Sequence, residues 1–367
     1  MILSIRCLSL TPLWTGDINR DSAKVHETSF LGSLRWWYRE IKRAAGEDVC
    51  NPTSDDAKER CPRPNKPVCP VCQLFGCTGQ ARRFRLEVSG LKPQPLFFIT
   101  HQDVYESNGF WLTTLWGGER SGRRQEARYT LNRQTLFVNH LEETPGYFEV
   151  KITPTQPGDF QVLQEVQALL AFIARYGALG ARTQNGFGQI ALVDIPENPL
   201  DIWPAATSFF SILFQLKGAE GLGRYRENIR FVGSAPMGFK DPLKAPFIPC
   251  AFDLRYKTST THPRTGEGRN LGLRPFFKNW KGSRVADALL GKPQGTKWKS
   301  RIHVSHLFRL DNQEIFYLKV FGFVPAHLAT EISNFPDVRE ISAKIKEFFM
   351  SEDMFPQSVV KWEHPAP

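Results

Sequence analysis

Five of the seven cysteines lie between residues 50 and 77, at Cys50, Cys61, Cys69, Cys72 and Cys77. The spacing Cys69-Pro-Val-Cys72 lets two thiolates reach one tetrahedral metal ion, as in a zinc knuckle. Cys61 and either Cys50 or Cys77 can complete a set of four thiolates. Four thiolates leave no open coordination position, so the zinc that this set predicts is structural. Two alternatives stay open: reduced thiols without a ligand, or disulfides in an intracellular protein of a thermophile.

A second candidate site is the glycine-rich segment from Gly177 to Gly188. It follows a helical pattern and precedes a strand. That order is the reverse of a nucleotide-binding phosphate loop, so the sequence does not support a nucleotide site. Its backbone amides, around Gly180, could meet the phosphates of a nucleic acid, with Arg182 adding positive charge. A plain tight turn is the alternative, because turns also need glycine.

Candidate catalytic groups are few. His26 is the histidine best placed to act as a general acid or base in metal-independent RNA cleavage. Asp17 and Asp21 could bind a divalent ion or position a phosphate. A catalytic site needs several convergent groups, and the sequence does not indicate such a set, so we expect no catalytic residue. A ribonuclease that uses His26 is the alternative.

The chain is strongly basic, with a formal net charge of +10 and a pI of about 9.3. Such a charge attracts polyanions, chiefly nucleic acid or an acidic membrane surface. Between residues 255 and 301 twelve Lys and Arg stand against two acidic residues, with Phe276, Phe277, Trp280 and Trp298 among them. This mixture suits single-stranded RNA, whose phosphates pair with cations and whose bases stack on rings. The alternative is that these rings anchor a solvated loop to the core.

The size and hydropathy of the chain favour a globular protein of two domains. Its 367 residues exceed what one core usually supports, and 41% hydrophobic residues are ample for packing. No run of about twenty apolar residues is present, so we expect no membrane span. The start, Met-Ile-Leu-Ser-Ile-Arg-Cys, is typical of a short strand and lacks the features of a signal peptide. We expect a cytoplasmic protein.

Periodicity predicts alternating strands and helices. Residues 2–10 suit a strand, residues 31–45 suit a helix that Thr28 or Ser29 can cap, and residues 161–176 form the clearest amphipathic helix of the first half. The remaining predicted elements are a helix over 338–350 and strands over 83–88, 96–100, 147–152, 189–193, 209–216, 251–256, 302–310 and 315–324.

This order of elements indicates an α+β fold of two ferredoxin-like βαββαβ domains, each with helices on one face of its sheet. The proline-containing stretch 196–204 predicts a boundary, which gives a first domain over 1–200 and a second, more diverged domain over 201–367. A polar, proline-rich insertion that carries the cysteines occupies residues 47–79 of the first domain. The two halves show no close sequence repeat, so the second unit rests on element order.

Three motifs follow one another between residues 11 and 190. The first is Leu13-Trp-Thr-Gly16 with Phe30-Leu-Gly-Ser-Leu-Arg-Trp-Trp-Tyr38. The second is Cys69-Pro-Val-Cys-Gln-Leu-Phe-Gly-Cys-Thr-Gly79 with Ala81-Arg-Arg-Phe-Arg85, and the third is Leu179-Gly-Ala-Arg-Thr-Gln-Asn-Gly-Phe-Gly188. In this order they resemble the RAMP superfamily of CRISPR proteins, and among them the first subunits of the type III-B effector, the Cmr complex. The second half resembles that family more weakly, through Arg301-Ile-His-Val-Ser-His-Leu-Phe-Arg309.

The resemblance implies two ferredoxin-like domains and a place in a ribonucleoprotein whose other members are CRISPR guide RNA, target RNA and further Cmr subunits. First subunits of this family cap the complex near the 3′ end of the guide RNA and are not the subunits that cleave the target. In the backbone subunits of such complexes a loop aspartate cleaves, and Asp17 and Asp21 lie in a comparable loop here. That match is positional, so it does not transfer the activity. The resemblance does not firmly imply zinc.

We therefore expect a non-catalytic RNA-binding subunit that requires no cofactor beyond the candidate structural zinc. Its contacts with phosphates would position the RNA backbone without reading bases. A scaffold whose basic surface meets acidic partner subunits is the other alternative. The residues expected to line the RNA-facing surface are Arg35, Arg39, Arg82, Arg83, Arg85, Arg120, Arg123, Arg124, Gly180, Arg182, Lys297 and Lys299.

Overall fold

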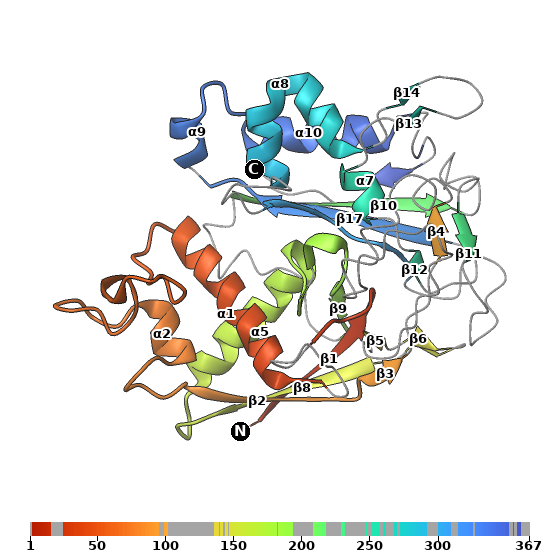
Figure 1. The fold of residues 1–367 in the computed structure, drawn as a ribbon. Helices are drawn as coiled ribbons and strands as arrows, with labels where there is room; N and C mark the ends of the chain where they lie inside the picture. Colours follow the sequence, from red (N-terminus) through yellow and green to blue (C-terminus); the bar gives the residue numbers. More distant parts are fainter. Residues whose placement is uncertain are drawn as a thin grey trace, which may run out of the picture.

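The fold is known from a computed structural model, in which sheets and helices stack in alternating layers (Figure 1). The structure describes residues 2–15, 25–94, 99–101, 136–138, 140–141, 144–145, 147–181, 183–193, 208–217, 229–231, 247–248, 251–256, 260–261, 268–269, 272–291, 300–309, 315–325, 327–351, 355 and 358–360.

The first sheet has antiparallel strands in the order β2-β8-β1-β9. Strand β1 (Leu3–Ser9) is central and pairs with β8 (Tyr147–Pro154) and β9 (Ile190–Leu192), while β2 (Phe84–Ser89) forms the edge beside β8. Buried residues alternate with more exposed ones along most of β8 and in the first half of β2, as in a strand with one face on a core.

Two helices cover one face of this sheet (Figure 1). Helix α1 (Glu27–Ala44) lies between β1 and β2 in the chain, and α5 (Phe160–Tyr176) lies between β8 and β9. The carboxylate of Asp159 caps α5 by accepting a hydrogen bond from the Val162 N–H, and the helix ends at Gly177 as predicted. The order strand, helix, strand, strand, helix, strand predicted for the first half is thus present. The buried residues of α1 recur at helical spacing: Phe30, Leu34, Trp37, Tyr38 and Ile41.

The second sheet is built on β10 (Phe209–Lys217) and β17 (Ile315–Phe323), which pair antiparallel along their whole length. In the first sheet, the strands lie side by side in the order second, third, first, fourth, counted along the chain, and in the second sheet the central pair carries further strands on both sides. The protein is therefore an α+β molecule with two antiparallel sheets. The outer strands of the second sheet are β18 (Val359–Val360) beside β10, and β12 (Phe247–Ile248), β15 (Ile302–Val304) and β16 (Leu307–Phe308) on the side of β17.

The helices that the structure describes in the second half are α7 (Ala251–Tyr256), α8 (Leu273–Leu290), α9 (His327–Glu331) and α10 (Val338–Phe349). Helix α10, predicted over 338–350, begins with a capping box. In that box the Asp337 carboxylate accepts from the Glu340 N–H, and the Glu340 carboxylate accepts from the Asp337 N–H. Apolar residues of α8 and α10 pack with one face of β10 and β17 in a second core.

The second sheet lies between two helical layers, with α8 and α10 on one side and α1 and α5 on the other (Figure 1). Phe210 of β10 belongs to the second core. Its neighbour Phe209 belongs to the first core, which residues of the first sheet form with α1 and α5. The ring of Phe209 lies 5.0 Å from that of Phe172 on α5 and 6.4 Å from that of Trp37 on α1, between centroids. The two halves of the chain therefore share one hydrophobic contact layer.

A buried lysine also joins the halves. Lys319 on β17 is 2% exposed, and its Nζ donates hydrogen bonds to the carbonyl oxygens of Ala174 (2.6 Å) and Gly177 (3.0 Å). These carbonyls lie at the C-terminus of α5, where the last carbonyls of a helix lack partners within the helix and favour a cation.

The remaining strands that the structure describes are short. They are β3 (Lys92–Gln94) with β5 (Leu136–Val138), β4 (Ile99–His101) with β11 (Ile229–Phe231), β6 (His140–Leu141) with β7 (Thr144–Pro145), and β13 (Thr260–Thr261) with β14 (Gly268–Arg269). Among the helices that the structure describes, none is both long and apolar enough to span a bilayer. The predicted domain boundary at residue 200 lies outside the described residues.

Several predictions of local structure are wrong. The first helix begins at Glu27, with His26 as the N-cap residue, so Thr28 and Ser29 lie inside it. Residues 251–256 form a helix rather than a strand, and residues 302–310 contain two short strands rather than one. At residues 251–256 the apolar run is short, and periodicity cannot then separate a helix from a strand.

The structure describes part of the basic, aromatic stretch over 255–301. Much of it is helix α8, in which Phe277 is fully buried and Phe276 and Trp280 pack against the second core. Phe277 is therefore part of the core, and Phe276 and Trp280 are half-buried against it. Trp298 lies outside the described residues.

Candidate functional site

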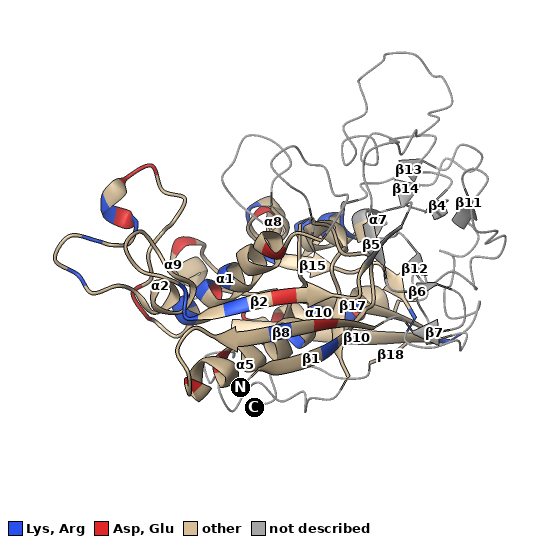
Figure 2. Ribbon diagram, turned by 90° about the horizontal axis from the view of Figure 1, so that it is seen from below, with Lys and Arg blue, Asp and Glu red and all other residues tan. Residues whose placement is uncertain are grey.

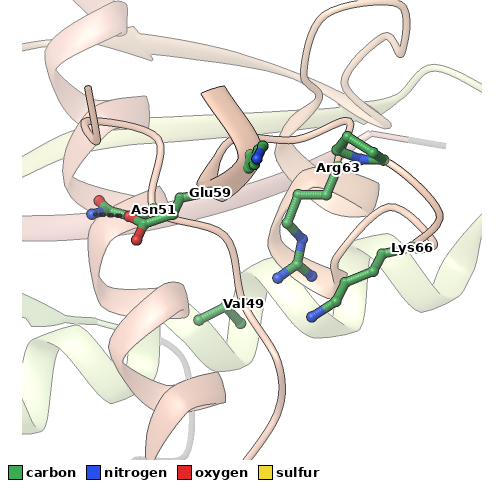
Figure 3. Close-up of a pocket in the computed structure, with 7 residues that line it drawn as sticks. Val49, Asn51, Glu59, Arg63 and Lys66 are labelled. Atoms are coloured by element: carbon green, nitrogen blue, oxygen red, sulfur yellow. Dashed lines mark hydrogen bonds between the residues drawn. The ribbon is translucent and has the colours of Figure 1, made fainter. Parts of the chain in front are cut away.

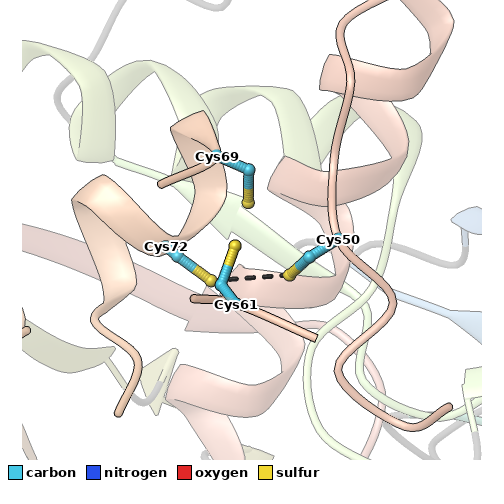
Figure 4. Close-up of side chains that lie close together, drawn as sticks. All are labelled: Cys50, Cys61, Cys69 and Cys72. Carbon is cyan, nitrogen blue, oxygen red and sulfur yellow. Dashed lines mark hydrogen bonds between the residues drawn. The ribbon is translucent and has the colours of Figure 1, made fainter. Parts of the chain in front are cut away.

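Four cysteine sulfurs converge in the insertion between α1 and β2 (Figure 4). The Sγ atoms of Cys50, Cys61, Cys69 and Cys72 all lie within 4.8 Å of one another, and those of Cys50 and Cys72 are 3.5 Å apart. Cys61 is half-buried, and the other three cysteines are buried. Cys77 is not in this group, so the fourth member of the set is Cys50.

The separation of the sulfurs fits a tetrahedral zinc site. Four sulfurs bound at about 2.3 Å from one zinc ion lie about 3.8 Å from one another. The observed 3.5 Å between Cys50 and Cys72 and the 4.8 Å limit for the whole group lie on either side of that value. A disulfide would need about 2.05 Å between two sulfurs. The six cysteines among the described residues are all free.

Helix α2 (Pro70–Phe75) positions two of the four cysteines. Pro70 occupies its first turn, where the missing N–H has no partner to lose and the fixed φ suits a helix. Cys69 is the N-cap residue and Cys72 follows three residues later, so both sulfurs lie at the start of the helix. The apolar side chains of α2 are buried in the first core, which holds the helix in place.

The four thiols differ in acidity. Burial acts to raise the pKa of Cys69, but hydrogen bonds from the backbone at Cys50 and Cys72 and from the thiols of Cys50 and Cys61 lower it to about 7. Burial raises the pKa of Cys72 and of Cys50. One thiolate is therefore accessible near neutral pH, and a metal ion bound there would ionise the other thiols by coordinating them.

Arg35 contacts this cluster. The sequence predicted it as an RNA contact, yet its Nη2 donates a hydrogen bond to the Cys72 Sγ at 3.0 Å. Its Nε is buried. Arg35 lies on α1, which the sequence did not connect with the cysteines.

A shallow cleft of about 430 Å³ lies in the same insertion (Figure 3). Arg63 Nη1 and Lys66 Nζ, which line it, lie 2.7 Å and 3.0 Å from the Asp48 carboxylate. Hydrogen bonds from these two cations lower the pKa of Asp48 to about 2, so the carboxylate is charged at neutral pH. The negative charge of Asp48 therefore offsets part of the positive charge that Arg63 and Lys66 bring to the cleft. Its lining residues are Val49, Asn51, Lys58, Glu59, Arg63, Pro64 and Lys66.

Two further predicted RNA contacts hold intramolecular ion pairs. Arg39 Nε lies 3.2 Å from the Glu40 carboxylate, and both side chains are only 12% exposed. Arg83 binds the Asp159 carboxylate through two nitrogens, at 2.7–3.1 Å. Since Asp159 also caps α5, the Arg83 pair fixes β2 against that helix.

Arg82 and Arg85 form no ion pair with another described residue, and Arg82 is half-buried whereas Arg85 is exposed. The Arg82 guanidinium lies over the ring of Phe84, 5.5 Å from its centroid, and Arg85 is exposed on the outer face of β2. Glu87 follows on the same face. Figure 2 shows blue and red segments on β2 and on β8 and a blue segment on β1, so this sheet carries both signs of charge.

The two ends of the glycine-rich segment are packed inside the protein, while Ala181 and Gln184 between them are exposed. The N–H of Gly180 donates to the Ser33 hydroxyl (2.8 Å) and that of Gly188 to the Pro12 carbonyl oxygen (3.0 Å). A Cβ at Gly188 would overlap the carbonyl oxygen of Leu179. Both glycines have φ above +80°, which favours glycine over any other residue. The backbone therefore needs glycine for close packing at these two positions, as the tight-turn interpretation requires.

Sequence reasoning missed the residues that hold this segment from the second half. Arg255 is fully buried and donates to the carbonyl oxygens of Gln184 and Leu290. His306 is buried as well, and its backbone N–H donates to the Gly186 carbonyl oxygen at 3.3 Å. Nothing in the sequence distinguishes Arg255 from the basic residues around it.

His26 has no side-chain hydrogen bond as the N-cap residue of α1, and its backbone N–H donates to the Thr15 hydroxyl at 3.4 Å. The other candidates lie outside the described residues: Asp17, Asp21, Arg120, Arg123, Arg124, Arg182, Lys297 and Lys299.

The sequence profile of the RAMP superfamily matches residues 6–191, which is more than half of the chain. The matched region contains most of the first sheet, both of its helices and the cysteine cluster. The protein belongs to the RAMP superfamily, as the sequence motifs predicted.

Solved structures with similarity to the chain include Cmr1 from Pyrococcus furiosus in its apo form. It is 14% identical, the match covers 98% of this chain and 94% of that chain, and the TM-score is 0.39. A chain of the type III-B Cmr-β complex bound to cognate target RNA is 13% identical, with 95% and 98% covered and a TM-score of 0.41. A chain of Cmr-β bound to cognate target RNA and AMPPnP, in the presence of ssDNA, is 12% identical, with 88% and 94% covered and a TM-score of 0.40. No curated protein matches the chain.

Proposed function

We propose that the protein is a non-catalytic RNA-binding subunit of a type III-B CRISPR effector complex. In this proposal it binds guide RNA near the 3′ end, meets target RNA and other Cmr subunits, and works in the cytoplasm. The observation that carries the proposal is membership of the RAMP superfamily over residues 6–191. The net charge of +10 supports RNA as the ligand, because a basic protein attracts polyanions.

Ion pairs within the protein narrow the set of arginines that we assign to RNA. Arg82 and Arg85 are retained, because neither has a carboxylate partner among the contacts described above. Arg39 and Arg83 are removed from the set, because ion pairs already occupy their guanidinium groups. The basic residues outside the described part of the chain stay in the proposal: Arg120, Arg123, Arg124, Arg182, Lys297 and Lys299.

The test is the binding of single-stranded RNA by the purified chain across a salt series. Each phosphate that a cation neutralises contributes about −0.7 to the slope of log K against log salt. Arg85→Ala and Arg182→Ala should each weaken binding and make the slope shallower by about that amount. Arg339→Ala is the matched control, because it removes one exposed cation from α10. Equal slopes in all four proteins would refute the assignment of Arg85 and Arg182.

The same samples test the absence of catalysis. We expect the RNA to stay full length on a denaturing gel with and without added divalent metal. Cleavage that disappears in His26→Ala would overturn the non-catalytic proposal and favour a ribonuclease. No RNA affinity at low salt, together with binding to a purified neighbouring subunit, would favour the scaffold.

We also propose that Cys50, Cys61, Cys69 and Cys72 hold a structural zinc ion. The mutual distances of their sulfurs support it, and the four thiolates would fill the coordination sphere. Elemental analysis of protein purified without added metal should find one zinc ion per chain. Cys72→Ser should lose it, and Cys77→Ser should keep it. Wild-type protein without zinc, or with fewer titratable thiols than cysteines, would instead indicate free thiols or disulfides.

A further inference from the structure

The cysteine cluster accepts a hydrogen bond from Arg35 on α1, at the Sγ of Cys72. We infer that Arg35 is a positioning residue of the metal centre, where its guanidinium neutralises charge on the sulfur of Cys72 and orients that ligand. This inference rests on the proposed zinc site. It also takes Arg35 out of the RNA-binding surface for which the sequence proposed it.

Charge is the first reason. Four thiolates around one zinc ion carry a net charge of −2, and three of the four cysteines are buried. A buried charge without a partner is strongly unfavourable, so such a site needs hydrogen bonds or cations around its sulfurs. Arg35 Nη2 lies 3.0 Å from the Cys72 Sγ, which places a permanent cation in contact with one ligand.

The neighbouring arginines do not supply this charge as directly. Arg63 interacts electrostatically with Cys61 and Cys69, but its guanidinium is bound to the Asp48 carboxylate at 2.7 Å. Arg39, one turn after Arg35 on α1, is paired with Glu40. In the described part of the chain, Arg35 is the cation whose hydrogen bond ends on a sulfur of the cluster.

The position of Arg35 on α1 gives the contact a second consequence. The Ser33 hydroxyl on the same helix accepts from the Gly180 N–H, and the Trp37 indole N–H donates to the Ala178 carbonyl oxygen at 2.9 Å. One helix thus contacts the cysteine cluster through Arg35 and the glycine-rich segment through Ser33 and Trp37. Arg35 links the metal centre to the element that carries the contacts between the halves.

Competition with a chromophoric zinc chelator tests the inference. We expect Arg35→Ala to bind zinc about 10- to 100-fold more weakly than the wild type, as for loss of an outer partner of a metal ligand. Arg35→Lys should retain part of the affinity, because it keeps a cation but not the planar fork of donors. Arg43→Ala, which removes an exposed cation from the same helix, should bind zinc as the wild type does. Cobalt-substituted protein adds a spectroscopic readout, since the sulfur-to-cobalt charge-transfer band should shift in Arg35→Ala.

The outcomes separate the two proposals. If wild-type protein binds no zinc, the zinc site is wrong and the role of Arg35 falls with it. If wild-type protein binds zinc and Arg35→Ala binds it equally tightly with an unshifted cobalt band, only the role of Arg35 is refuted. Zinc-loaded Arg35→Ala should bind single-stranded RNA as tightly as the wild type, and a loss of several-fold would show that Arg35 contacts RNA. Should Arg35→Ala fail to fold, Arg35→Gln, which keeps a donor without the charge, supplies the same comparison.

Discussion

Replacing Lys319 by methionine removes the ammonium group that joins the second sheet to α5, while keeping a side chain of similar length. Lys319 is 2% exposed, and its Nζ donates to the carbonyl oxygens of Ala174 and Gly177. Each buried carbonyl that loses its donor costs about 1–3 kcal/mol, so the two together cost about 2–6 kcal/mol, and a cation at a helix C-terminus contributes up to about 2 kcal/mol. Removing a buried ammonium recovers several kcal/mol of desolvation free energy. We therefore expect a net loss of about 2 kcal/mol in the free energy of unfolding.

Urea unfolding followed by tryptophan fluorescence measures this loss. Lys217→Met is the matched control, because Lys217 is an exposed lysine on the neighbouring strand β10. The control should stay within about 0.5 kcal/mol of the wild type. If Lys319→Met is as stable as Lys217→Met, the two hydrogen bonds make no net contribution, and our reasoning about the buried cation is wrong.

Two further predictions concern the dependence of stability on pH and the replacement of a glycine. Burial lowers the pKa of His303 and His306 to about 3, below the value of about 6.5 in an unfolded chain, so acidification protonates the unfolded state first. Stability should be complete above about pH 6.5 and lower at pH 5 by about 2 kcal/mol for each histidine. His303→Phe should reduce this dependence of the urea midpoint on pH, and a midpoint that does not change with pH in the wild type would contradict the burial argument. Gly188→Ala should destabilise by at least about 2 kcal/mol more than Gly158→Ala. Both glycines have φ near +80°, but a Cβ at Gly158 meets nothing within 4 Å. If thermal unfolding shows that Gly188→Ala and Gly158→Ala lose the same stability, the Leu179 carbonyl moves aside to admit the Cβ at position 188.

Much of the first half could be predicted because its signals are local. Helix α5 has a long apolar period and a glycine at its end, and the structure confirms the predicted range within one residue. The spacing Cys69-Pro-Val-Cys72 predicts two sulfurs that can reach one metal ion, and the structure places both sulfurs in one cluster. The spacing could not choose between Cys50 and Cys77, since that choice depends on how the insertion folds back.

The rest depends on contacts between segments far apart in the chain. The sequence shows Arg35 as one of several arginines on a helix, but its partner Cys72 is 37 residues away. Arg83 meets Asp159 across 76 residues, and Lys319 meets α5 across more than 140. Residue type alone marks each of these as a surface cation, which is the usual place for Lys and Arg. Aromatic residues within a basic segment indicated RNA, although in α8 they fill the core.

The shared layer between the halves limits how this protein can be divided. Phe209 and Phe321 come from the second sheet but belong to the first hydrophobic core, beside Trp37 and Phe172. A fragment that ends near residue 200 would expose the rings of α1 and α5 to water, and the complementary fragment would expose its own. Each fragment alone would expose an apolar face that favours aggregation. Expressed together, the two fragments present matching faces, which makes the chain suited to reassembly from two polypeptides and unsuited to study as isolated domains.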